Sequence, residues 1–180
     1  MNIISLLVNI GIVAILLTAL IYFWNRKISL IDSFLQNFCG ALFVFSGWVK
    51  AVDPVGTAYK MEQYFEHFES TFAATWMKFI APLFPLLGKF SISFSIFMIV
   101  LEIVLGVMLI LGAYRKLTAW LFFGIILFFT ALTGFTYLTG YVPEGVNFFD
   151  FSNWGLYSEN NMKVKDCGCF GDFIKLEPKI

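Results

Sequence analysis

Four long apolar runs constrain this chain more than any other feature. They cover residues 1–24, 29–50, 91–113 and 117–139. About 20 apolar residues span the hydrocarbon core of a bilayer as one helix. The composition agrees, since 59% of the residues are hydrophobic and 13% are charged, against about half and a quarter in soluble domains. The sequence therefore predicts an all-α membrane protein with a bundle of four transmembrane helices.

The first run has two competing explanations, a retained helix and a cleaved signal peptide. A signal peptide carries a basic segment before its apolar part and a small-residue cleavage site after it. Here nothing basic precedes the run, and Arg26 and Lys27 follow it. We therefore expect residues 1–24 to be a retained transmembrane helix.

Residues 51–90 have a different pattern. Pro54 is expected to stop the second helix at Asp53, because proline disfavours helical geometry in the residue before it. Aromatic residues then recur at helical spacing among charged ones, which predicts an amphipathic helix over residues 57–78. This helix is expected to lie along the membrane surface or against the other helices. His67 is expected to be a solvated residue of this helix. Residues 79–87 are apolar but too short to span, so they are expected at the interface.

Two short basic loops predict the orientation. Arg26-Lys27 and Arg115-Lys116 fall on the same side of a four-span protein, and neither loop holds an acidic residue. The more basic side stays in the cytoplasm. We therefore expect a multi-pass protein of the bacterial inner (cytoplasmic) membrane. Its N-terminus, residues 51–90 and an irregular tail over residues 140–180 would face the periplasm, where disulfides persist.

This tail holds two of the three cysteines, Cys167 and Cys169, on either side of Gly168. Cysteines two apart can form a disulfide if the backbone kinks, and glycine permits that kink. Such a small, strained ring tends to be oxidising and labile. Three interpretations stay open: a redox-active pair, a structural pair that staples the tail or joins other cysteines, and a metal site. The third has only Asp166 and Asp172 as nearby ligands, so we predict no metal.

Glu102 lies near the middle of the third run. An ionisable group at membrane depth costs about 2.5–3.5 kcal/mol on insertion scales, and it normally faces a partner inside the bundle. Candidate partners are Lys50, Thr130 and Thr133. Its role stays open between a neutral hydrogen-bond donor, an ion-pair partner, and a proton acceptor beside a quinone-like ligand. Glu102, Lys50 and Asp53 form the expected set of intramembrane polar residues.

Three blocks of residues together carry a family resemblance. They are Phe45-Ser46-Gly47-Trp48-Val49-Lys50-Ala51-Val52-Asp53-Pro54, Glu102 to Gly106 with Gly112 and Arg115, and Thr139-Gly140-Tyr141-Val142-Pro143 followed by residues 166–172. From about Ile31 onward the chain resembles the DoxX-like superfamily, which includes the MauE-type proteins. It is most similar to DoxX-like proteins of Bacteroidota type.

That resemblance implies a small helical bundle in the inner membrane. MauE relatives help disulfide formation in methylamine dehydrogenase, and other DoxX relatives are associated with membrane oxidoreductase complexes and quinone chemistry. The bundle also resembles the vitamin K epoxide reductase type, which uses a C-x-x-C pair where this chain has C-x-C. Family members continue past a segment like residues 175–179 into another span, so a further helix is expected beyond residue 180.

Two function hypotheses follow. In the first, catalytic Cys167 and Cys169 exchange disulfides with a periplasmic thiol protein, and electrons pass to a quinone held among the last three spans near Glu102. In the second, the chain is a non-enzymatic accessory or scaffold subunit of a larger envelope complex, and the cysteines only staple the tail. Both have the lipid bilayer as a partner. The formal net charge is zero, so no basic field attracts nucleic acid.

Overall fold

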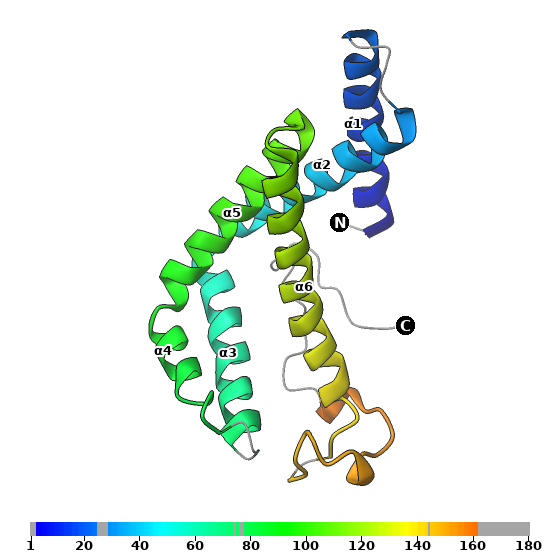
Figure 1. Cartoon of the computed structure of the whole chain (residues 1–180). Helices are drawn as coiled ribbons and strands as arrows, with labels where there is room; N and C mark the ends of the chain where they lie inside the picture. Colours follow the sequence, from blue (N-terminus) through cyan, green and yellow to red (C-terminus); the bar gives the residue numbers. More distant parts are fainter. Residues whose placement is uncertain (1–2, 25–28, 74, 76–77, 144, 162–180) are drawn as a thin grey trace. The chain divides into compact units, whose positions relative to one another are not determined.

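The computed structural model describes residues 3–24, 29–73, 75, 78–143 and 145–161 (Figure 1). In these residues the regular secondary structure is helical, with no strand. The elements in chain order are α1 (Ile3–Trp24), α2 (Leu30–Val52), α3 (Pro54–Ala73), α4 (Leu83–Lys89), α5 (Ser91–Leu111), α6 (Arg115–Thr139), and the short 3-10 helices η1 (Phe151–Asn153) and η2 (Glu159–Asn161).

The helices α1, α2, α5 and α6 are each long and apolar enough to cross a membrane, with spans of 20 to 25 residues. A helix rises 1.5 Å per residue, so 20 residues cover about 30 Å, the thickness of the hydrocarbon core. Many of their large apolar side chains are exposed, such as Leu16 on α1 and Phe97 on α5. The prediction of an all-α membrane protein with four membrane-length helices is confirmed.

The chain divides into two compact units, which are described separately. The first contains residues up to Val52 together with 97–125, and the second contains 53–96 together with the residues from Ile126 onward. In the first unit α1 packs against α2. Buried Asn37 donates a 3.0 Å hydrogen bond to Thr18 Oγ1, and Thr18 donates to the carbonyl of Ala14 at 2.7 Å. These polar groups satisfy one another where water is excluded.

The helices α2 and α5 approach each other closely through glycines. A Cβ atom added at Gly106 would lie 2.7 Å from the carbonyl oxygen of Gly40 and 2.8 Å from the amide nitrogen of Val44. One added at Gly47 would lie 2.6 Å from Cγ1 of Ile103. Small residues allow such backbone contact between membrane helices. This crossing places the last turns of α2 beside the middle of α5.

The second unit is built on an aromatic core. Its buried members are Met61, Tyr64 and Phe65 of α3 with Leu132 of α6. The Tyr64 hydroxyl bonds Thr136 Oγ1 at 3.2 Å, so the phenol is buried with a polar partner. Figure 1 shows α4 lying beside α3, as their contacts also record. The predicted amphipathic helix is thus observed as α3, with its apolar face in this core.

The described residues after α6 are irregular, as predicted, and several contacts hold them against the end of that helix. The amide of Gly155 donates to the Tyr141 carbonyl, and the amide of Ser158 donates to the Gly140 carbonyl, each at 2.9 Å. The rings of Tyr137 and Tyr157 stack with their centroids 5.5 Å apart. These contacts fold residues 140–143 and 145–158 back on the end of α6.

Candidate functional site

The first unit contains a buried ion pair between two membrane helices. Lys50 Nζ of α2 lies 2.5 Å from Glu102 Oε1 of α5, and each side chain is only 2% exposed. Ser46, one turn before Lys50, accepts a 3.0 Å hydrogen bond from Lys50 Nζ and donates a 3.1 Å bond to Glu102 Oε2. Both carboxylate oxygens of Glu102 therefore have partners.

The local sequence explains how this cluster forms. Ser46 and Lys50 are four residues apart on one helix, so they share a face. Gly47 lies between them, where an added Cβ would come within 3.3 Å of Glu102 Cβ, and its missing side chain lets α5 bring Glu102 close. Lys50 also lies in the last turn of α2, where a cation is favoured by the helix dipole.

The chemistry of the cluster follows from this pairing. A charged group at membrane depth is costly alone, but a bonded pair of opposite charges offsets most of that cost. Of the candidate partners of Glu102, the structure places Lys50 against it. Which of the three roles Glu102 has in function stays a prediction. The bonds from Lys50 and Ser46 to Glu102 hold the end of α2 against the middle of α5.

Asp53, grouped above with the intramembrane polar residues, directly follows α2, which ends at Val52, and its side chain is exposed. Its Oδ1 accepts a 2.8 Å hydrogen bond from the amide of Gly56, so it caps the start of α3. Pro54, with its fixed φ and missing N–H, fills the first helical position after that cap.

The structure describes one of the three cysteines. Cys167 and Cys169 lie outside the described residues. Cys39 is a free thiol, half-buried on α2. His67, expected to be solvated, is half-buried on α3. Across the described part of the chain, no group of three or more His, Cys, Asp or Glu side chains is arranged to hold a metal ion.

Sequence reasoning missed the polar contacts inside the first unit. Asn37 bonds Thr18, and Gln36 of α2 donates to the Leu109 carbonyl of α5. The signal was available, because two uncharged amides in an apolar run need partners when lipid surrounds them. What the sequence could not provide was which helix supplies each partner.

The fold and the buried pair define an integral membrane protein with several spans, in which α2 and α5 are joined by a lysine and a glutamate. More specifically, the chain belongs to the MauE family, because residues 25–144 match the family described as methylamine utilisation protein MauE. The match includes Lys50 and Glu102 and stops before Cys167, whereas we had expected the resemblance to continue to the end. No curated protein and no solved structure matches the chain.

Proposed function

We propose that this MauE-family protein acts in thiol–disulfide exchange at the outer face of the bacterial inner membrane, with Cys167 and Cys169 as its reactive pair. The observation that carries this proposal is the position of the pair in the sequence. Cys167 follows Asn161, the last residue of η2, by six residues. A fully extended chain covers no more than about 3.6 Å per residue, so Cys167 lies within roughly 20 Å of Asn161.

Exchange moves the disulfide from the Cys167–Cys169 pair to its partner. A thiolate of a periplasmic partner attacks one sulfur of the Cys167–Cys169 disulfide, and that S–S bond breaks as a mixed disulfide forms. The partner's second thiolate then attacks the mixed disulfide. The partner leaves with a disulfide, having lost two electrons and two protons, and Cys167 and Cys169 become thiols. A quinone held among the last three spans would supply the two-electron oxidation that returns Cys167 and Cys169 to the disulfide, and it would take up their two protons.

The Lys50–Glu102 pair has a supporting role in this proposal. Its oxygens and its ammonium bond one another and Ser46, so we assign it to holding α2 against α5 and not to proton transfer. This assignment separates Glu102 from Cys167 and Cys169. Replacing Glu102 should lower the amount of folded protein, whereas replacing either cysteine with serine should leave folding intact and abolish exchange.

The experiment measures whether the pair cycles in cells. Thiols are trapped with a maleimide of large mass, with and without an added periplasmic oxidant, and the Cys167→Ser/Cys169→Ser variant identifies the bands. We expect a mixture of oxidised and reduced pairs that shifts with the oxidant. A pair fixed in one state under both conditions contradicts the proposal.

A second candidate function is supported by the same buried pair. Since both carboxylate oxygens of Glu102 are bonded, the described part of the chain favours a scaffold role for the bundle. In that case the protein is a non-enzymatic accessory subunit of an envelope complex, and the cysteines staple the tail. It predicts a pair that stays oxidised, and a Cys167→Ser/Cys169→Ser variant that still copurifies with its complex.

A further inference from the structure

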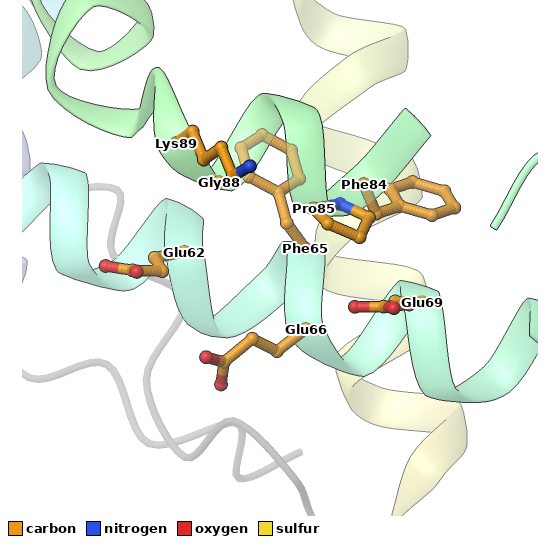
Figure 2. Close-up of a pocket in the computed structure, with 8 residues that line it drawn as sticks. All are labelled: Glu62, Phe65, Glu66, Glu69, Phe84, Pro85, Gly88 and Lys89. Atoms are coloured by element: carbon orange, nitrogen blue, oxygen red, sulfur yellow. The ribbon is translucent and has the colours of Figure 1, made fainter. Parts of the chain in front are cut away.

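A groove of about 210 Å³ lies between α3 and α4 in the second unit (Figure 2). Such a volume has room for about seven waters at ~30 Å³ each. Its walls combine carboxylates, one ammonium and aromatic rings, from residues Glu62, Glu66, Glu69, Lys89, Phe65 and Phe84. In Figure 2 the three glutamates come from α3, and Lys89 comes from α4 across the groove.

The charges on this groove are unbalanced. Glu62, Glu66 and Glu69 are three and four residues apart, so they share one face of α3, and like charges at that spacing destabilise a helix. Among the residues that the structure describes, the ion pair joins Lys50 and Glu102. None of these three glutamates takes part in it. A ligand with a cationic end would neutralise the α3 wall, and an anionic end would suit Lys89 on the opposite wall.

The groove also lies next to the membrane along the chain. Lys89 is two residues before Ser91, where the membrane-length helix α5 begins. Leu83, Leu86 and Phe90, on or next to α4, expose 50%, 53% and 59% of their surface. Exposed apolar residues of a surface helix enter the boundary between headgroups and acyl chains. Such contacts would bring the groove to the depth of lipid headgroups.

We propose that this groove binds the headgroup of phosphatidylethanolamine. The primary ammonium of that lipid donates its N–H groups to Glu66 and Glu69, and Lys89 binds the phosphate. Phosphatidylcholine has no N–H to donate, and phosphatidylglycerol brings an anion without a cation to three carboxylates. The inference goes beyond the redox proposal, because it holds whether or not the cysteines cycle.

The test uses the full chain in nanodiscs with equal parts of the three lipids, followed by native mass spectrometry of the lipids that stay bound. We expect phosphatidylethanolamine to be retained over phosphatidylcholine on the order of fivefold, the effect of an exposed ion pair, with phosphatidylglycerol retained least. The preference should be lost in Glu66→Gln/Glu69→Gln, whereas Lys89→Gln should lower the retention of all three lipids, because each carries the phosphate. Asp32→Asn, which removes an exposed carboxylate elsewhere, should keep it.

A second measurement needs no variant. A carbodiimide joins a carboxylate to an amine in contact with it, so it should couple the lipid amine to a peptide containing Glu66 or Glu69. Equal retention of the three lipids, a preference for phosphatidylglycerol, or a preference unchanged in Glu66→Gln/Glu69→Gln overturns the proposal. So does coupling of these glutamates to lysines of another protein with no lipid adduct, which would identify a basic protein partner as the occupant.

Discussion

Removing one member of the Lys50–Glu102 pair should strongly destabilise the protein. Each side chain is only 2% exposed, so Glu102→Leu leaves a buried ammonium without its counter-charge. Breaking a buried pair in this way costs about 3–5 kcal/mol, and a lone charge at membrane depth costs about 2.5–3.5 kcal/mol. We therefore expect Glu102→Leu and Lys50→Met each to lower the free energy of unfolding by about 3 kcal/mol.

The double variant Lys50→Met/Glu102→Leu separates pairing from packing. Replacing a whole buried pair by apolar residues of similar volume is often neutral or stabilising, so the double variant should lie within about 1 kcal/mol of the wild type. With single losses of about 3 kcal/mol each and a double change of at most about 1 kcal/mol, the coupling free energy between the two sites should be about 5 kcal/mol.

The assay is reversible unfolding in mixed micelles by titration with a denaturing detergent, followed by circular dichroism. Asp32→Asn is the control, because Asp32 is exposed and such substitutions usually change stability by less than about 0.5 kcal/mol. Single variants that lose less than 0.5 kcal/mol, or losses that simply add in the double variant, would refute the reasoning.

Three further predictions use the same titration. Gly106→Leu should lose about 1–3 kcal/mol of stability by overpacking, because an added Cβ there meets backbone at 2.7 Å. Gly124→Ala should gain up to about 1 kcal/mol from helix propensity, because an added Cβ there meets nothing within 4 Å. Equal effects of the two variants would argue against the close crossing. Asp53→Ala should lose about 0.5–2 kcal/mol with its cap, and Asp53→Asn should lose less. Tyr64→Phe should lose about 1 kcal/mol, because it removes the hydroxyl bonded to Thr136; an unchanged midpoint would contradict that bond's contribution.

The sequence was sufficient for the four membrane-length helices, because their length and apolar content allow few other folds in lipid. It was also sufficient to single out Glu102 and to name Lys50 among its partners, since a lone charge at that depth requires one. The sequence could not predict that Gly40 contacts Gly106. It indicated only that small residues tend to lie where membrane helices cross.

Other features depended on three-dimensional placement. Asp53 is near Lys50 in sequence, but α2 ends at Val52, and Asp53 caps the start of α3. The groove between α3 and α4 was hidden because Glu62 and Glu69 look like the solvated face of an amphipathic helix. Only the packing of α4 against that helix creates a wall opposite them.

The most direct test of the account is the side of the membrane on which Cys167 and Cys169 lie. In a Cys39→Ser background, intact cells are treated with an impermeant reductant and then with an impermeant maleimide of large mass. The account predicts that both thiols are labelled before the membrane is permeabilised. Labelling that occurs only after permeabilisation would place the pair in the cytoplasm and contradict exchange at the outer face.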